Sequence, residues 1–171
     1  MSFLHRYRIL IFLIAATLAY LYFSEDDART AIEKRYLELV GVVELEESGQ
    51  PLDLIFQARA IEEFIDQSVA FELVRGDQRF ERVSSARALS DRLLGIYQNY
   101  RNLSIESRSL NIILESDTIA QLNSQVTARA RLSQGISRMV EVYDLELEYY
   151  RVDDQWLIRE IELTQITSRT E

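Results

Sequence analysis

Side chains that could carry chemistry in this chain are carboxylates, tyrosine hydroxyls and arginines. The sequence contains no cysteine and a single histidine, His5. Without cysteine there is no disulfide, no thiol nucleophile and no thiolate zinc site. His5 precedes a long apolar segment at the amino terminus, so histidine catalysis and a histidine-ligated metal are excluded for the rest of the chain. We therefore predict no metal site and no cofactor.

Acidic residues recur at every second position near the carboxyl end. In a β-strand, residues with this spacing share one face. The preceding alternating segment carries Arg129 and Arg131 on the side away from its apolar positions. We expect cross-strand charge pairs on a solvated face, where each pair contributes little. The acidic residues are Asp144, Glu146 and Glu148.

Two other uses of this acidic face stay open. One is a calcium site, although strands hold the acids apart and no loop gathers them. The other is a surface that binds a basic protein partner, to which Tyr150 would add a contact.

The amino-terminal segment is apolar enough to enter a membrane. Between Ile9 and Phe23 every residue except Thr17 is apolar. A helix over these residues covers about 22 Å, and one that starts at residue 3 covers about 31 Å, close to the hydrocarbon thickness of a bilayer. We predict an uncleaved signal anchor that spans the membrane through residues 9–23. The chain then divides into residues 1–23, a cytoplasmic tip and anchor, and residues 24–171, an exported domain.

Flanking charge predicts the orientation of this anchor. Arg6 and Arg8 precede the span, and three acidic residues follow it at positions 25–27. The positive-inside rule places the amino terminus in the cytoplasm and the domain in the periplasm, at a bacterial inner membrane. The alternatives are a cleaved signal peptide, with a small-residue site at positions 17–19, and a buried core helix. The net charge of −9 argues against binding to nucleic acids.

The rest of the chain predicts helices followed by strands. Apolar residues at spacings of three and four predict helices over 24–47 and 52–66, and Ser84 or Ser85 caps a third. A hairpin is expected over 68–82. Alternation then predicts strands over 103–114, 120–132, 139–149 and 156–167, with a slip of phase between Ile105 and Leu110 and an acidic turn at 152–155. This is an α+β class, with the helices on one face of a mostly antiparallel sheet.

Three stretches resemble one known superfamily. Two helices and a short hairpin read IFQARAIEEFIDQSVAFELVRGDQRFERV, and a helix feeds a long strand in SARALSDRLLGIYQNYRNLSIES. The ending VEVYDLELEYYRVDDQWLIREIEL places a tryptophan in the last strand. Over about residues 27–167 the chain resembles the nuclear transport factor 2-like, or cystatin-like cone, superfamily. It departs from many members in having Asp-Asp-Gln rather than Asp-Gly in the last turn.

The resemblance implies a cone with a pocket between the curved sheet and the helices. Members include isomerases, dehydratases, polyketide cyclases and epoxide hydrolases, and many others only bind or scaffold. A membrane-tethered version forms the periplasmic part of an inner-membrane component of type IV secretion. Dimers through the sheet are common, so a homodimer of that kind is an expectation here.

Within such a pocket the family generally places an acidic residue or histidine as general base. Asp66 and Glu141 are the candidates, with Tyr143 as hydroxyl partner of Glu141. The alternatives are that Asp66 is a turn residue bonded to backbone and that Glu141 is a carboxylate in water at the sheet edge. Aromatic candidates for the pocket, which could equally fill the core, are Phe56, Phe64, Phe71, Tyr97, Tyr143 and Trp156.

These observations favour a non-enzymatic, membrane-anchored periplasmic module that binds a protein partner in an envelope assembly. The alternative is a small-molecule binder, or an isomerase- or dehydratase-like enzyme that uses a pocket carboxylate. The state of the pocket discriminates between them. A closed, aromatic-filled cone excludes the enzyme, and an open cavity with a buried carboxylate favours it.

Overall fold

The described residues form three α-helices and a long curved sheet, and the first two strands lie between the second and the third helix. The computed structural model describes residues 27–46, 50–133 and 138–170. The first helix covers residues 27–43 of this part. The second, α2 (Pro51–Ala60), continues into a short 3-10 helix, η1 (Ile61–Glu63), and α3 (Ala86–Asn99) follows a hairpin.

Six strands form one sheet in the order β2-β1-β6-β5-β4-β3. Neighbours are antiparallel except β1 and β6, which are parallel. The strands are β1 (Ile65–Arg75), β2 (Gln78–Val83), β3 (Tyr100–Leu114), β4 (Ile119–Leu132), β5 (Arg138–Val152) and β6 (Gln155–Thr170).

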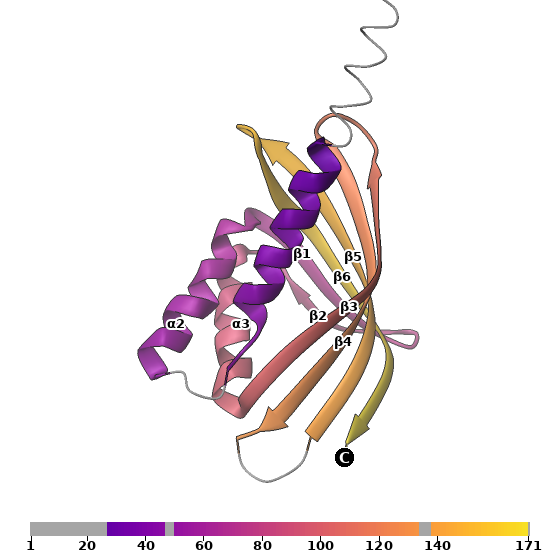
Figure 1. Ribbon diagram of the computed structural model, residues 1–171. Helices are drawn as coiled ribbons and strands as arrows, with labels where there is room; N and C mark the ends of the chain where they lie inside the picture. Colours follow the sequence, from indigo (N-terminus) through magenta and orange to yellow (C-terminus); the bar gives the residue numbers. More distant parts are fainter. Residues whose placement is uncertain (1–26, 47–49, 134–137, 171) are drawn as a thin grey trace, which may run out of the picture.

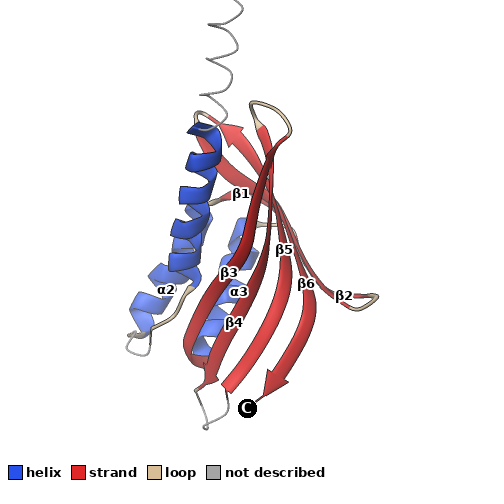
Figure 2. Ribbon diagram, turned by 45° about the vertical axis from the view of Figure 1, so that its right-hand side comes forward, coloured by secondary structure: helices blue, strands red, loops and turns tan. Residues whose placement is uncertain are grey.

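The sheet curves around the helices, which all lie on its concave side (Figures 1 and 2). The order of elements predicts helices on one face, because only they are available to cover the apolar face of the sheet, and the curvature gives the cone that the resemblance implies. Strand alternation decides which side chains reach that face. On β4, Ala120, Leu122 and Val126 are buried, while Gln121 and Gln125 are exposed.

Buried tyrosines hold the first helix against the rest of the domain. The hydroxyl of Tyr97 on α3 donates to the carbonyl oxygens of Val42 and Val43, at 2.9 and 3.0 Å. Tyr36 shares a hydrogen bond of 2.6 Å with Ser107 on β3. Because the last carbonyls of a helix have no partner within the helix, the Tyr97 hydroxyl caps its carboxyl end.

The predicted turn at 152–155 and the predicted slip are confirmed. Asp153 and Asp154, between β5 and β6, both have positive φ, 46° and 64°, as a type I′ hairpin turn requires. On β3 the register against β4 shifts between Arg108 and Asn111, where Ser109 has a φ of 58°. This bulge puts both Ile105 and Leu110 on the core side.

Two helix boundaries differ from the prediction. The first helix ends at residue 43, because Leu45 exchanges two backbone hydrogen bonds with Leu103 on β3. The second helix does not reach Asp66. Backbone pairing takes over at Phe64, whose carbonyl accepts from the amide of Ile158 on β6 at 2.9 Å. Competition from the sheet therefore shortens both helices.

The structure leaves the predicted membrane anchor undecided. Residues 9–23, and with them the start of the predicted first helix, lie outside the described residues. Across 27–46, 50–133 and 138–170, no helix is long and apolar enough to cross a membrane.

Candidate functional site

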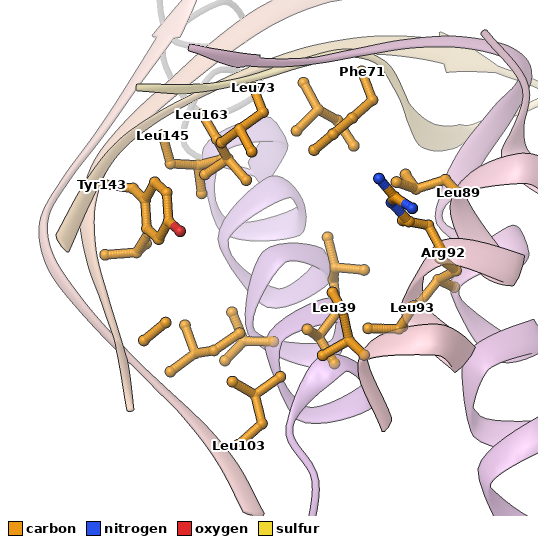
Figure 3. A pocket seen from close by; sticks show the side chains of 18 of the residues that line it. Leu39, Phe71, Leu73, Leu89, Arg92, Leu93, Leu103, Tyr143, Leu145 and Leu163 are labelled. Carbon is orange, nitrogen blue, oxygen red and sulfur yellow. The ribbon is translucent and has the colours of Figure 1, made fainter. Parts of the chain in front are cut away.

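An open cavity of about 460 Å³ lies between the sheet and the helices. The first helix and α3 form one wall, through residues such as Leu39 and Leu93, and the concave face of the sheet forms the other, through Phe71 and Leu163 (Figure 3). Nearly all of the lining is aliphatic or aromatic. A volume of this size lies within the range of about 300–1,000 Å³ that is usual for small-molecule sites.

Small side chains on β4 help to leave this space. Ala128 and Ala130 line the cavity and lie opposite Glu141 and Met139 of β5. At these two inward positions a methyl group alone cannot fill the space beneath a strongly curved sheet. The cavity is thus a consequence of strand alternation and of alanines at two inward positions.

One carboxylate interrupts the apolar wall. Glu141 of β5 is half-buried, and its Oε2 accepts a hydrogen bond of 2.5 Å from the hydroxyl of Tyr143. Its Oε1 accepts from the amide of Gln165 at 2.8 Å and from the hydroxyl of Ser168 at 3.1 Å, both on β6. Donors therefore surround both oxygens, as suits an ionised carboxylate.

Arg75 of β1 contacts this cluster through Gln165. The Nε of Arg75 donates to Oε1 of Gln165. This contact orients the amide so that its NH2 group, rather than its oxygen, faces Glu141. Four residues from three strands thus fix the position of one carboxylate at the cavity wall.

Tyrosines next to Glu141 are held in the neutral form. Burial, the hydrogen bond to Glu141 and the negative charge of Glu141 raise the pKa of Tyr143 above its ordinary value. Burial and the charge of Glu141 likewise raise the pKa of Tyr100, which also lines the cavity. The raised pKa values keep both phenols protonated, and thus able to donate, further into the alkaline range.

Asp66, the other candidate base, lies outside this site. Its Oδ1 accepts from the amide of Ser68 at 2.8 Å and from the hydroxyl of Ser68 at 2.5 Å. These two hydrogen bonds lower the pKa of Asp66. Asp66 is absent from the cavity lining, so the structure matches the turn-residue alternative.

The six aromatic candidates separate into three groups. Phe71 and Tyr143 line the cavity. Phe64, Tyr97 and Trp156 are buried in the core and do not line it. Phe56 is 71% exposed on α2. The residues of this short helix are apolar on every side. Periodicity therefore could not show that Leu54 and Ala58, rather than Phe56, face the core.

The acidic residues of β5 lie on the outer face of the sheet, as predicted, but their predicted partners are elsewhere. In the register of β4 and β5, Gln125 faces Asp144 and Asn123 faces Glu146. Arg129 instead bonds Glu106 on β3 at 2.8 Å. The sequence could not give the length of the connection between the strands, and that length sets which residues oppose one another. Tyr150 is 37% exposed at the same face.

One residue of the cavity lining and two partners of Glu141 were not singled out from the sequence. Gln165 and Ser168 occupy inward positions of the last strand. A polar residue at a position that should be apolar was the sequence signal that could have identified them. Arg92 lies within the apolar stripe of α3, three residues after Leu89. It is part of the cavity wall that faces Tyr143 (Figure 3). In the described part of the chain, no cluster of histidine, cysteine or acidic residues has a metal-binding arrangement.

Comparison with known proteins shows the fold. No family model matches the chain, and no curated protein matches it. Among solved structures, a candidate scytalone dehydratase from Novosphingobium aromaticivorans is 17% identical and superposes with a TM-score of 0.71, over 86% of this chain and 90% of that one. A hexachlorocyclohexane dehydrochlorinase of the second type is 13% identical with a TM-score of 0.70, over 87% of this chain and 92% of that one.

A third structural neighbour is named for its fold. It is a nuclear transport factor 2-like protein with a cystatin-like fold from Novosphingobium aromaticivorans, 14% identical with a TM-score of 0.63, over 90% of this chain and 88% of that one. The domain therefore has the nuclear transport factor 2-like fold expected from its sequence. Sequence identities this low show a shared architecture and do not assign an activity.

Proposed function

We propose that this domain binds a small, mostly apolar organic molecule in the cavity between its sheet and its helices. The observation that carries the proposal is an open cavity of about 460 Å³ whose apolar wall contains one carboxylate, Glu141. A core built only for stability would close such a space, because empty volume costs free energy. At the liquid volume of about 30 Å³ per water, the space holds a ligand of roughly 15 non-hydrogen atoms.

The structural neighbours support this proposal over a purely scaffolding role. Two of them bear names of enzymes that act on small organic molecules, a dehydratase and a dehydrochlorinase. The likeness extends to most of each chain, although it is a likeness of fold.

Proton abstraction is the chemistry that Glu141 offers such a ligand. Its Oε2 would take a proton from a carbon of the ligand, and the electrons of that C–H bond would form a double bond to the neighbouring carbon. In an elimination a leaving group departs from that neighbouring carbon with its bonding pair, and in an isomerisation an adjacent double bond shifts and its far carbon receives the proton. Tyr143 would hold the carboxylate in place through its hydrogen bond.

Filling the cavity tests the proposal. Ala128 lines the cavity opposite Glu141, so Ala128→Phe fills the space. The matched control is Val140→Phe, because Val140 lies on the outer face of β5. We expect the intact chain and the control to bind a neutral apolar dye small enough for this volume, 1-aminonaphthalene, with enhanced fluorescence, and the Ala128→Phe variant to lose that signal. Equal fluorescence in all three folded proteins would refute a cavity site.

A second candidate function, docking of a basic protein on the outer face of the sheet, is favoured by the acidic residues gathered there. Glu146 and Glu148 lie opposite Glu162 and Glu160 of β6. Pull-down from solubilised membranes tests it, with Glu146→Lys as the disrupting variant. A partner retained equally by the intact chain and the variant would exclude this face.

We also propose that residues 9–23 tether the domain to a bacterial inner membrane with the domain in the periplasm. The apolar run and its flanking arginines support the tether. Membrane fractionation followed by proteolysis of spheroplasts tests it. Digestion of the domain from outside is expected, and full protection or release as a soluble protein would overturn it.

A further inference from the structure

Glu141 is an acidic group at an apolar cavity, and no cation among the described residues bonds to it. Its hydrogen-bond partners are Tyr143, Gln165 and Ser168, all neutral. Within the described chain it forms no ion pair. A half-buried carboxylate is costly unless a charge or strong donors compensate for lost water. The three donors supply part of that compensation, and a ligand with a positive charge would supply the rest.

Soft, electron-rich groups surround this carboxylate. Tyr100, Met139 and Tyr143 line the cavity together with Glu141. The hydroxyl of Tyr100 lies 3.9 Å from the sulfur of Met139. Tyrosine rings attract organic cations within about 6 Å of the ring centre, and such groups form the aromatic cages that bind methylated ammonium ions.

The remaining wall is apolar and suits a hydrocarbon tail. Away from Glu141, the cavity is formed by leucine, isoleucine and valine side chains such as Leu93, Leu145 and Leu163. The net charge of −9 also raises the concentration of organic cations near the protein relative to that of anions.

We propose that the ligand of this cavity is an organic ammonium ion with an apolar tail, whose nitrogen pairs with Glu141 between Tyr100 and Tyr143. This inference rests on the proposed function, since it needs a ligand in the cavity. It gives Glu141 an anchoring role in place of proton abstraction. The cation that faces the cavity, Arg92, extends from α3 on the wall opposite Tyr143 (Figure 3), which leaves room for the tail between the two groups.

A series of ligands with one tail and three head groups tests the charge preference. Decylammonium, decanol and decanoate each have fewer than the roughly 15 non-hydrogen atoms that the volume admits. Titration calorimetry on the intact chain, with the Ala128→Phe variant as the reference for binding outside the cavity, gives the cavity-dependent affinity of each. We expect decylammonium to bind at least about tenfold more tightly than decanol, as a charge-assisted hydrogen bond predicts, and decanoate to bind more weakly than both.

Two glutamate-to-glutamine variants distinguish a local ion pair at Glu141 from an effect of the net charge of the protein. Glu141→Gln keeps the shape and hydrogen-bonding capacity of the side chain but removes its charge. Glu146→Gln removes the same charge on the outer face. We expect the preference for decylammonium over decanol to disappear in the first variant and to persist in the second. An equal loss in both would overturn the proposal, since it would reflect net charge alone.

The ligand series remains decisive if Glu141→Gln does not fold. Binding of decanol as tight as that of decylammonium would overturn the inference and leave a cavity that binds neutral ligands. A preference for decanoate would overturn it and assign the head group to Arg92. Binding of the dye without any of the three ligands would also overturn it. Absence of both dye and ligand binding would remove the proposed function itself.

Discussion

Glu146 of β5 lies directly opposite Glu162 of β6, on the outer face of the sheet. Glu162 in turn faces Glu72 of β1, and the next pair along β5 and β6 is Glu148 with Glu160. Only Glu72 among these five forms an ion pair within the described chain, with Arg79 at 3.2 Å. Like charges directly opposite one another destabilise a sheet, so this face carries an energetic cost that function or solubility must explain.

The Glu162→Lys variant is expected to be more stable than the unmodified protein. Lysine at this position would lie between Glu146 and Glu72 and would replace two repulsions by two attractions. We expect about 1 kcal/mol of added stability and a melting temperature about 2–4 °C higher, measured by circular dichroism at low salt. Asp117→Lys makes the same charge change in an exposed turn and is the control. An equal gain in both variants would assign the effect to net charge.

The Tyr97→Phe variant is expected to lose about 1 kcal/mol of stability. The change removes one hydroxyl and leaves the carbonyl oxygens of Val42 and Val43 without that donor. Denaturant unfolding measures the loss, and Tyr150→Phe, at an exposed tyrosine, is the control. Because these carbonyls end the helix that forms one cavity wall, dye binding should weaken in parallel. Unchanged stability would show that water replaces the hydroxyl without cost.

The contribution of Asp66 is expected to depend on pH in the acid range. Its pKa in the folded protein is lowered from 3.8 by two hydrogen bonds from Ser68. The ionised form is thus favoured by folding, so the stabilisation is present above pH 3.8 and is lost as the pH falls through the lowered value. We expect Asp66→Asn to cost roughly 0.5 kcal/mol at pH 7, since the group is largely solvated. Denaturant curves at several pH values should show this difference shrink towards pH 3, whereas a constant difference would contradict the assignment.

Alkaline pH is expected to destabilise the protein through Tyr143. Its folded pKa is raised from 10.0, so folding favours the protonated phenol. The stabilisation is present below pH 10 and is lost as the pH rises above it, because the unfolded chain then releases the proton first. Tyr143→Phe should reduce the slope of stability against pH above pH 10. An unaltered slope would assign the alkaline effect to the other buried tyrosines, Tyr97 and Tyr149.

Much of the candidate site follows from strand periodicity. Glu141 and Tyr143 share the parity of Leu145 and Leu147, and that parity alone predicts that the acid and the phenol lie side by side on the inner face. The prediction could not extend to Gln165 and Ser168. They belong to a different strand, and their approach depends on the pairing of β5 with β6, whose register shifts twice.

Helix α2 marks the limit of the same reasoning. Apolar residues occupy most of its positions, so the sequence alone left its buried face undetermined. Packing against α3 buries Ala58 and leaves Phe56 exposed. The other five aromatic candidates could be assigned to the interior but not to cavity or core, because both are apolar environments.

By itself the sequence determined the class of fold, the face on which the residues of the regularly alternating strands lie and the exclusion of cysteine and histidine chemistry. These properties depend on local alternation, turn residues and composition. The tertiary structure alone decided that a cavity exists, which acids oppose one another and which donors surround Glu141. Those depend on sheet curvature, strand register and the parallel pairing of β1 with β6, which join residues as far apart as Arg75 and Gln165. Contacts between such distant positions leave no periodic pattern in the chain, so only the folded arrangement reveals them.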